Sequence, residues 1–518
     1  MSMPPDWMID SPRPYTKVLV ANRGEIAVRV LQAAREAGLI GVAVYSSIDS
    51  SSLHVEIADE SVLLEGQGLE ETYLSIDAII AAAKSCGAEA IHPGYGFLSE
   101  RAEFAREVNS SGLIWIGPPP SAIETMGDKI SARSLMIESG VPVIPGEQIP
   151  IREGSDHLGD LASAAAKVGY PLLIKASAGG GGKGMRSVTE PKNLRIEFET
   201  AAREASAAFG DGTVYIERLL SGARHVEIQV LCDSQGTAIH LNERDCSLQR
   251  RYQKVIEEAP SPGLTQQTRD EMGKAAVTAA RSVGYVGAGT VEFLLASNGQ
   301  FFFLEMNTRI QVEHPVTEMT TGVDLVQKQF EIAAGLPMGI RQEEVPQHGH
   351  SIEARLYAED PDNGFLPSTG TLVVWRQPSG PGIRVDSGVR EGDSVTIDFD
   401  PMLAKLVVHA PDRKSAIRRL HNALSSFVVL GVRTNIEFLR RALSHSSFQS
   451  GIIDTDFLDS TDPSELSGTE PDKITLVSIA ASSRRLGIDK QTSTSAEETD
   501  YHTGHSGDPF RTLGRPFP

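Results

Sequence analysis

The sequence predicts a mixed α/β protein of several domains, and three observations along the chain indicate this class. Strand-like and helix-like segments alternate between residues 17 and 117. A β-hairpin signal lies near residue 298, and short β segments separated by Gly and Pro run from residue 350 to about 408, before two helices. A chain of 518 residues is also too long for one core, so two to four domains are expected.

The first unit is predicted to be a doubly wound parallel sheet. Its expected strands lie at 17–22, 42–46, 88–92 and 113–117, and its expected helices at 25–37, near 76–85 and near 103–109. Strands that alternate with helices indicate parallel pairing with helices on both faces. The turn at 21–25 lacks the pattern G-x-G-x-x-G, which argues against a dinucleotide site.

A ligand-site candidate follows the expected strand at 88–92. Gly94, Tyr95 and Gly96 come directly after it, and open α/β sheets bind ligands beyond the carboxyl ends of their strands. A tight turn explains the same three residues equally well.

Four consecutive glycines, Gly179 to Gly182, precede Lys183 and follow a buried strand that carries Lys175. Packing does not explain the run, because each glycine carries a backbone-entropy cost, whereas close approach of N–H groups to phosphate oxygens does. It is not a P-loop, because Gly184 stands where that motif has Ser or Thr. We expect a phosphate-binding loop that can act as a lid, with a flexible linker as the alternative.

A hairpin is predicted around Asn298 and Gly299, between strand-like runs at 290–295 and 301–306. If these two residues form a type I′ turn, Glu292 lies directly opposite Glu305. Like charges in that position repel each other, so a hard cation such as Mg²⁺ is expected between them.

The same face of the hairpin continues into polar residues. Asn307 follows Glu305 two residues later, and Arg309, Gln311 and Glu313 keep the alternation. A cation, a donor and a further carboxylate are therefore expected beyond the metal. The alternative is an exposed polar strand with solvated glutamates.

A cation-dense run occupies residues 243–254, between an alternating strand at 225–231 and the break that begins at Glu257. Such a run is usually a solvated basic face. In this acidic protein, an anion site explains it at least as well.

The third unit begins after Gly335, with a strand at 350–358 that carries Arg355. Helices are expected at 415–425 and 435–443. From about residue 463 the chain is rich in Ser, Thr, Asp and Gly and is predicted to be mostly disordered, with one helix candidate at 474–486.

Composition excludes several classes of function. A net charge of −20 argues against nucleic-acid binding, and no apolar run is long enough for a membrane span. Cys86, Cys232 and Cys246 form no metal or disulfide pattern, which favours a reducing, cytoplasmic environment. Residues 1–16 have neither a signal nor a transit pattern and are expected to be a disordered leader.

A series of spaced motifs resembles biotin carboxylase, the ATP-grasp component of biotin-dependent carboxylases. The motifs are ANRGEIAVRV (21–30), IHPGYGFLSE (91–100), MGDK (126–129), IKASAGGGGKGMR (174–186), RHVEIQV (224–230), ERDCSLQRRYQK (243–254), EEAP (257–260) and EMNTRIQVEHPVTEM (305–319). The resemblance covers roughly residues 17–458. The segment 353–370 is most similar to α subunits of bacterial and mitochondrial acyl-CoA carboxylases.

The resemblance implies a division of the chain into domains. After the leader at 1–16, it implies an N-terminal domain at 17–125, an ATP-grasp domain at 126–335 with a mobile lid at about 147–219, a C-terminal mixed β/α domain at 348–458, and a disordered tail or linker start at 459–518.

The resemblance also implies roles for individual residues. ATP-binding residues would be Lys129, Lys175, Gly181, Gly182, Glu217, Arg218, Leu220, His225, Gln249, Glu292 and Glu305. Ligands of two Mg²⁺ or Mn²⁺ ions would be Glu292, Glu305 and Asn307. Bicarbonate-binding residues would be Lys254, Arg309, Gln311, Val312 and Arg355, with Tyr95 and Arg355 at the biotin site. The catalytic set would be Lys254, Arg309, Arg355 and Glu313, the last as general base.

The implied reaction is ATP- and bicarbonate-dependent carboxylation of biotin on a separate carrier protein, through carboxyphosphate. It is the first half-reaction of an acyl-CoA carboxylase, so a carboxyltransferase is a further implied partner. The chain has no Met-Lys-Met motif to carry its own biotin. A homodimer is also implied, with Arg29 and Glu36 on the helix expected at the contact.

One departure from the family and two alternatives remain open. Tyr252 stands where many members have His, which leaves one contact to the ATP phosphates undecided. A non-catalytic scaffold that binds ATP is one alternative. Another ATP-grasp ligase, of the carbamoyl-phosphate or purine-pathway kind, is the second.

Overall fold

The computed structural model describes residues 14–149, 157–176, 185–209 and 214–467. The chain divides into two units, Met1–Leu466 and Ser467–Pro518, and every element named below belongs to the first. The glycine run at 179–182 with the predicted ligands Gly181 and Gly182, the helix predicted at 474–486 and nearly all of the predicted leader lie outside the described residues. No helix in the described ranges is long and apolar enough to cross a membrane.

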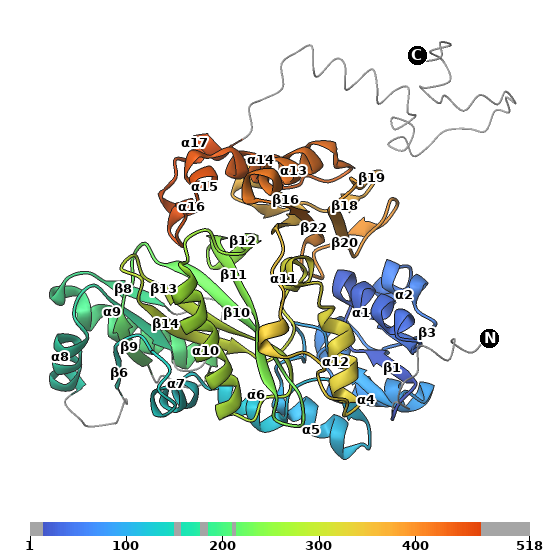
Figure 1. The fold of residues 1–518 in the computed structure, drawn as a ribbon, viewed down its shortest axis with the longest axis horizontal. Coiled ribbons are helices and arrows are strands. Elements are labelled where there is room, and N and C mark those ends of the chain that lie inside the picture. The colour runs from blue at the N-terminus through green and yellow to red at the C-terminus, as the bar shows by residue number, and fades with distance from the viewer. Residues whose placement is uncertain (1–13, 150–156, 177–184, 210–213, 468–518) are drawn as a thin grey trace, which may run out of the picture. The chain divides into compact units, whose positions relative to one another are not determined.

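The N-terminal part is a five-stranded parallel sheet, as predicted (Figure 1). Its strand order is β3-β2-β1-β4-β5, with β1 (Lys17–Val20), β2 (Ile40–Tyr45), β3 (Glu60–Leu63), β4 (Ala90–His92) and β5 (Ile114–Trp115). The helices of this part are α1 (Gly24–Glu36), α2 (Leu53–Ile57), α3 (Gly68–Glu71), α4 (Ile76–Cys86) and α5 (Ala102–Ser110).

Residues of β1 face two different cores, which shows that the sheet is covered on both faces. Val18 and Val20 pack in a core with α1, whereas Leu19 packs in a core with α4 and α5. Successive side chains of a strand point to opposite faces, so a strand buried on both sides is apolar in its buried part, as Val18, Leu19 and Val20 are.

The edge strand β3 was not predicted. Glu60, Ser61 and Leu63 are exposed, so the segment lacks the apolar run that identified its neighbours. An edge strand with charged and polar side chains is a common way to avoid pairing with another chain.

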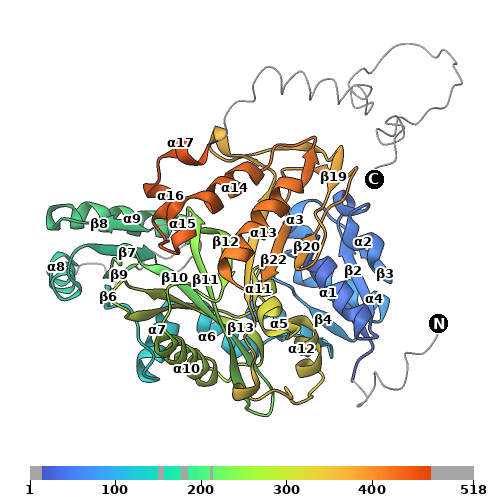
Figure 2. The ribbon, with the colours of Figure 1, turned by 45° about the horizontal axis from the view of Figure 1, so that its top comes forward.

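The centre of the molecule is one eight-stranded antiparallel sheet of order β14-β13-β10-β11-β12-β15-β22-β20 (Figure 2). Its strands are β10 (Arg224–Cys232), β11 (Ala238–Arg250), β12 (Gln253–Ala259), β13 (Gly287–Leu295), β14 (Phe301–Asn307), β15 (His350–Tyr357), β20 (Ile383–Ser387) and β22 (Met402–Ala410). Pairing of β12 with β15 carries this sheet from the central region into the C-terminal region, where the sequence suggested a restart.

The cation-dense run at 243–254 forms parts of β11 and β12, in the middle of this sheet. Arg251 and Tyr252 form the two-residue turn between the strands, with φ of 49° and 65°. Neither is glycine, so the turn holds two left-handed residues at a cost of roughly 1–2 kcal/mol each.

The alternative of a solvated basic face is wrong for the inward-facing part of the run at 243–254, because Arg244 is fully buried.

The predicted hairpin exists, but its turn differs from the predicted one. Leu295 pairs with Phe301, and Gly299 (φ 84°) is left-handed while Asn298 is not, so the turn is not type I′. A bulge next to Glu292 shifts the register by one residue and restores the predicted pair Glu292–Glu305.

Residues in the predicted lid region form a separate four-stranded sheet of order β6-β9-β7-β8. Its elements are β6 (Gly146–Ile149), α8 (His157–Val168), β7 (Leu172–Ala176), β8 (Arg186–Val188), α9 (Leu194–Phe209) and β9 (Val214–Arg218). Leu172, Ile174 and Phe198 belong to its own small core, distinct from the cores of the other sheets.

The remaining helices cover the central sheet and complete the C-terminal part. They are α6 (Pro120–Gly127), α7 (Lys129–Glu138), α10 (Gln266–Ser282), α11 (His314–Thr321), α12 (Leu325–Ala333), α13 (Arg413–Ser426), α14 (Ile436–Ser444), α15 (Ser446–Ser450), α16 (Phe457–Ser460) and α17 (Pro463–Leu466). Helix α10 packs on β10 and β11, and α13 packs on β15 and β22 (Figures 1 and 2). Three two-stranded pairs complete the fold: β16 (Glu359–Asp360) with β17 (Leu366–Pro367), β18 (Gly370–Thr371) with β21 (Ser394–Val395), and β19 (Val374–Arg376) with β23 (Val428–Leu430).

Candidate active site

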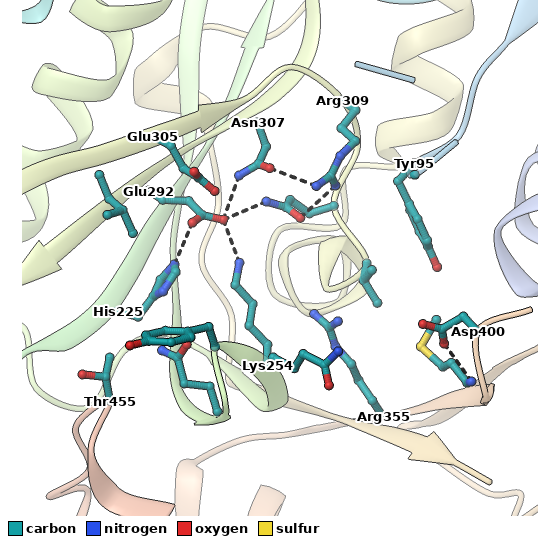
Figure 3. Close-up of a pocket in the computed structure, with 18 of the residues that line it drawn as sticks. Tyr95, His225, Lys254, Glu292, Glu305, Asn307, Arg309, Arg355, Asp400 and Thr455 are labelled. Atoms are coloured by element: carbon teal, nitrogen blue, oxygen red, sulfur yellow. Dashed lines mark hydrogen bonds and ion pairs between the residues drawn. The ribbon is translucent and has the colours of Figure 1, made fainter. Parts of the chain in front are cut away.

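A cavity of about 760 Å³ lies where the N-terminal, central and C-terminal parts meet (Figure 3). Its size suits a nucleotide or a similar ligand. The predicted site residues that line it are Tyr95, Lys129, Lys175, Glu217, Arg218, Leu220, His225, Gln249, Lys254, Glu292, Glu305, Asn307, Arg309, Gln311, Val312 and Arg355. Glu313 lies behind this lining and contacts two of its members, Lys254 and Arg355.

Glu292 is the centre of the hydrogen-bond network in the cavity (Figure 3). Its Oε1 accepts from the side-chain amides of Asn307 at 2.8 Å and Gln311 at 3.0 Å, and from Lys254 Nζ at 2.8 Å. His225 Nε2 lies 3.1 Å from its Oε2. Asn307 lies at the end of β14 and Gln311 in the loop that follows, and both donate to Glu292. The side chains of this alternating run therefore lie on one side, as predicted.

Lys254 lies among three carboxylates, with its Nζ 2.5 Å from Glu227, 2.6 Å from Glu313 and 2.8 Å from Glu292. Burial by itself would lower the pKa of Lys254, but these three charges outweigh it and raise that pKa well above its ordinary value. Lys254 is therefore a fixed positive charge inside the cavity.

Glu313 is fully buried between two cations. Its Oε1 meets Lys254, and its Oε2 accepts from Arg355 at 2.9 Å. Burial would raise the pKa of this carboxyl, but Lys254, Arg355 and Arg244 outweigh it and hold the pKa well below its ordinary value. Glu313 is thus ionised, the form that a general base requires.

Arg309 is held by four acceptors around its guanidinium. Its Nε donates to Glu100 at 2.9 Å, and its terminal nitrogens donate to the Asn307 side-chain oxygen at 2.9 Å, the Gln311 side-chain oxygen at 3.1 Å and the Ile310 carbonyl at 3.2 Å. This fixes a planar donor group at the edge of the cavity, which suits a small planar anion.

Arg355 connects the base to the C-terminal half of the sheet. Its Nε donates to Glu257 at 2.6 Å, while its NH2 group donates to Glu313. Tyr95 lines the same end of the cavity, and its hydroxyl has no hydrogen-bond partner within the described residues. These groups leave room for a ligand between the N-terminal and C-terminal parts (Figure 3).

The opposite end of the cavity is built from the predicted ATP-binding side chains. Lys175 Nζ contacts the Glu217 carboxylate, and both side chains are buried. Burial lowers the pKa of Lys129, which Glu305 partly offsets, so this ammonium lacks full compensation from the protein. Partly compensated lysines beside a cavity are suited to hold phosphate oxygens.

The hairpin carboxylates fit divalent cations. Burial, followed by the charge of the directly opposite Glu292, raises the pKa of Glu305, so the Glu305 carboxylate lacks full compensation from the protein. Carboxylate oxygens are the ligands that Mg²⁺ and Mn²⁺ prefer. Asn307 turns its amide oxygen toward Arg309, so its role as a metal ligand stays a prediction.

Two fully buried residues that support the site were not singled out from the sequence. Glu227 accepts from Lys254 and from Arg244, whose Nε lies 2.5 Å away. The terminal nitrogens of Arg244 donate to Gln229, Thr290 and Thr317, so each nitrogen of the guanidinium has a partner. A glutamate inside the apolar strand HVEIQV was the available signal for Glu227, because an inward charge there needs a buried partner.

Three further residues that reach the site were not singled out from the sequence, although Glu100 ends the motif at 91–100. Glu100 reaches Arg309 from the loop after β4, and Thr455 and Asp456 line the cavity from the segment before α16. Tyr252, which departs from the family pattern, also lines the cavity and is 62% exposed. Tyr252 therefore lies at the rim of the cavity. Whether its side chain contacts ATP stays a prediction.

Comparison with known families gives three consecutive matches. Residues 14–123 match the family described as "Biotin carboxylase, N-terminal domain", residues 128–341 match "Carbamoyl-phosphate synthase L chain, ATP binding domain", and residues 353–460 match "Biotin carboxylase C-terminal domain".

Individual relatives agree with these matches. The chain is 48% identical over 443 residues to biotin carboxylase of Allochromatium vinosum, covering 86% of this chain and 98% of that protein. It is 52% identical over 448 residues to the mitochondrial methylcrotonoyl-CoA carboxylase subunit α of Dictyostelium discoideum, but spans 63% of that longer protein.

A solved structure shows the same fold. The biotin carboxylase domain dimer of Hydrogenobacter thermophilus 2-oxoglutarate carboxylase, in complex with MgADP, ADP and bicarbonate, has a TM-score of 0.84 and 43% identity. The match covers 89% of this chain and all of that one. With all three domains matched in order, the chain belongs to the biotin carboxylase family of ATP-dependent enzymes.

Proposed function

We propose that this chain carboxylates biotin on a carrier protein, using ATP and bicarbonate, as the first half-reaction of an acyl-CoA carboxylase. One observation carries the proposal: a buried, ionised Glu313 contacts both Lys254 and Arg355, and these two cations line the same cavity as the hairpin carboxylates. The base Glu313, the anion-binding ammonium of Lys254 and the metal-binding hairpin carboxylates then lie close enough to act on the same bound bicarbonate and ATP.

In this scheme, the guanidinium of Arg309 and the ammonium of Lys254 bind bicarbonate, with Gln311 and Val312 beside them. Glu313 accepts the bicarbonate proton, and the resulting oxygen attacks the γ-phosphorus of ATP to give carboxyphosphate and ADP. Lys175 offsets negative charge that develops on the phosphate. Divalent cations bound by Glu292 and Glu305 would supply further charge compensation there.

The second step occurs at the Arg355 end of the cavity. Carboxyphosphate breaks to CO₂ and phosphate, and phosphate removes the proton of the biotin ureido nitrogen. Arg355 stabilises the biotin enolate, and Tyr95 borders the space for the ring. The nitrogen then attacks CO₂ to give carboxybiotin.

The relatives support proposals about the partners of this chain. The relative from D. discoideum is named as a subunit of a CoA-substrate carboxylase, which supports a carrier and a carboxyltransferase as partners. The dimer of the H. thermophilus domain supports a homodimer. The contact through α1, where Glu36 is exposed, stays a prediction. Arg29 would contribute less, because it binds Glu318 and Asp324 of its own chain. A cytoplasmic location stays a prediction.

Activity with free biotin tests the proposal. ADP formation by the full chain should require bicarbonate, and biotin at millimolar concentration should increase it and yield carboxybiotin. Bound ATP without any biotin-stimulated turnover would favour a scaffold. Turnover with ammonia or an amine, and none with biotin, would favour another ATP-grasp ligase.

A further inference from the structure

Lys405 is a fully buried lysine on β22, and it has no part in the proposed catalytic or ligand-binding sets. Its Nζ donates to the carbonyl of Val312 at 2.9 Å. The carboxylates of Glu25 and Asp386 lie 3.3 Å and 3.8 Å from the same nitrogen. Burying an ammonium group costs free energy unless the group is paired. A lysine kept in this position therefore indicates that its hydrogen bond and its charged partners have a function.

The Val312 carbonyl is bound differently from its neighbours. The carbonyls of Ile310, Gln311 and Glu313 accept hydrogen bonds from groups close in sequence: Arg309, His314 and the backbone of Val316. The Val312 carbonyl instead accepts from Lys405, 93 residues later in the chain. The orientation of the Val312–Glu313 peptide is therefore set from β22.

That orientation matters for the base. The peptide plane before Glu313 sets the direction in which its side chain leaves the backbone, and the carboxylate must reach both Lys254 and Arg355. A displacement of about 1 Å at a reacting group can cost about a hundredfold in rate. Val312 itself lines the cavity, so the same hydrogen bond also fixes one wall of the predicted bicarbonate pocket.

Lys405 is charged in its buried position. Burial would lower its pKa, but the carboxylates of Glu25, Glu353 and Asp386 outweigh it and raise that pKa. The hydrogen bond to Val312 is thus charge-assisted and about twice as strong as a neutral one.

The partners of Lys405 come from three parts of the chain. Glu25 lies at the start of α1, Asp386 on β20, and Val312 in the segment before α11, and both α1 and α11 contact β22. A Cβ added to Gly388 would lie 2.6 Å from the backbone nitrogen of Glu25, so the start of α1 packs directly on the C-terminal part. This close packing keeps the Glu25 carboxylate beside Lys405.

We propose that Lys405 is a positioning residue of the bicarbonate pocket, which holds the Val312–Glu313 peptide in place from the junction of the three domains. The proposal rests on the proposed function, because it assigns Lys405 to the base and wall of that pocket. Lys405 touches no substrate and acts through Val312 and Glu313.

Lys405→Met removes the charge and the donor while keeping most of the side-chain volume. We expect kcat/KM for bicarbonate to fall about tenfold to a hundredfold, the range set by a charge-assisted hydrogen bond. The dissociation constant of MgADP should change less than about twofold, because Lys405 does not line the cavity. Glu25→Gln with Lys405→Met removes one charge of each sign and is the second variant if the single one does not fold.

Arg413→Met is the matched control. Arg413 binds Glu258, which follows Glu257 on β12 and so points to the opposite face of the sheet. This variant should lower thermal stability and leave kcat/KM for bicarbonate unchanged.

The possible outcomes separate the two claims. Wild-type chain without bicarbonate-dependent ADP formation would overturn the proposed function, and the Lys405 assignment with it. Active wild type with unchanged bicarbonate kcat/KM in Lys405→Met overturns the Lys405 assignment alone. The same holds if neither Lys405 variant folds, or if Arg413→Met shows an equal loss, because Lys405 would then act through stability.

Discussion

At the scale of single residues, the balance of charge around Lys254 decides what the cavity can bind. Its ammonium lies within 2.8 Å of Glu227, Glu292 and Glu313, more carboxylates than one cation can neutralise. Arg244 and Arg355 supply the remaining positive charge to Glu227 and Glu313. A bicarbonate ion that reaches Lys254 must compete with these carboxylates, which places it directly beside the proposed base.

Glu313→Gln tests the base at this scale. The amide cannot accept the bicarbonate proton, so turnover should fall by about a hundredfold to ten-thousandfold, the usual contribution of a general base. ATP binding should remain, because Glu313 contacts Lys254 and Arg355, whereas the predicted ATP-binding pair Lys175 and Glu217 lies at the opposite end of the cavity. Steady-state ADP formation and equilibrium nucleotide binding measure the two effects, and equal turnover in the variant would contradict the assignment.

Arg355→Ala separates the two chemical steps. Biotin carboxylation should be lost, since the enolate loses its cation, while part of the bicarbonate-dependent ATP hydrolysis should remain because Lys254 still contacts Glu313. Carboxybiotin and ADP are measured in the same reaction. If both products fall by the same factor, Arg355 acts in the first step instead.

At the scale of elements, the β13–β14 hairpin shows how a correct pairing can have an unpredicted cause. Sequence reasoning placed Glu292 opposite Glu305 by assuming a two-residue turn at Asn298–Gly299. The observed turn is longer, and a bulge compensates for it. Bulges depend on packing against neighbouring strands and leave no local sequence pattern, so the predicted pair is correct although the turn from which it was predicted is not.

Gly299→Ala tests that turn. Gly299 has φ of 84°, so a Cβ there should destabilise the protein by about 1 kcal/mol, whereas nothing lies within 4 Å to clash with it. Asn298→Asp is the control: it keeps the side-chain oxygen that accepts from the Gln300 backbone and should change the melting temperature little. Equal losses in both variants would contradict the observed turn.

At the scale of the whole molecule, buried charges connect parts that are distant in sequence. Glu318 on α11 accepts from Arg29 of α1 at 3.0 Å and from Arg384 of β20 at 2.8 Å. The long-range pairing of β12 with β15 likewise extends one sheet through two predicted domains. Such links cannot be read from periodicity, which reports the face of an element but not its neighbour.

Much of the fold was nevertheless predictable from local pattern. The alternation in the N-terminal part gave the parallel sheet because β1 and β2 are apolar on both faces. The strand β3 was not predicted, because an exposed edge strand resembles ordinary polar sequence. The buried pair Glu227 and Arg244 was not predicted either, because its charged residues look in the sequence like surface residues. Side chains of the site were predictable where one hairpin carries them, whereas Glu100 depends on the tertiary fold.

Glu318→Gln tests the connection between α1, α11 and β20. Burial would raise the pKa of Glu318, but Arg29 and Arg384 lower it below its ordinary value of 4.5. Its contribution to stability is therefore present above pH 4.5 and is lost as the pH falls through the lowered pKa. Removing one partner of a buried pair costs about 3–5 kcal/mol, so the variant should melt well below wild type at pH 7.

The difference between the two proteins should then narrow at acid pH, as the wild-type carboxylate becomes protonated. Melting temperatures of both, measured from pH 7 to pH 3, check this. A difference that stays constant over the whole range would show that the charge of Glu318 does not matter.

The most direct test of the central claim is the binding of Mn²⁺ to the Glu292–Glu305 pair in the presence of ATP. Measured by electron paramagnetic resonance, Mn²⁺ affinity should fall at least about tenfold in Glu305→Gln, because one carboxylate ligand is lost. The metal-free variant should also be no less stable than wild type, since the repulsion with Glu292 is removed. Unchanged Mn²⁺ affinity in Glu305→Gln would contradict the claim that this hairpin holds the metal of the nucleotide.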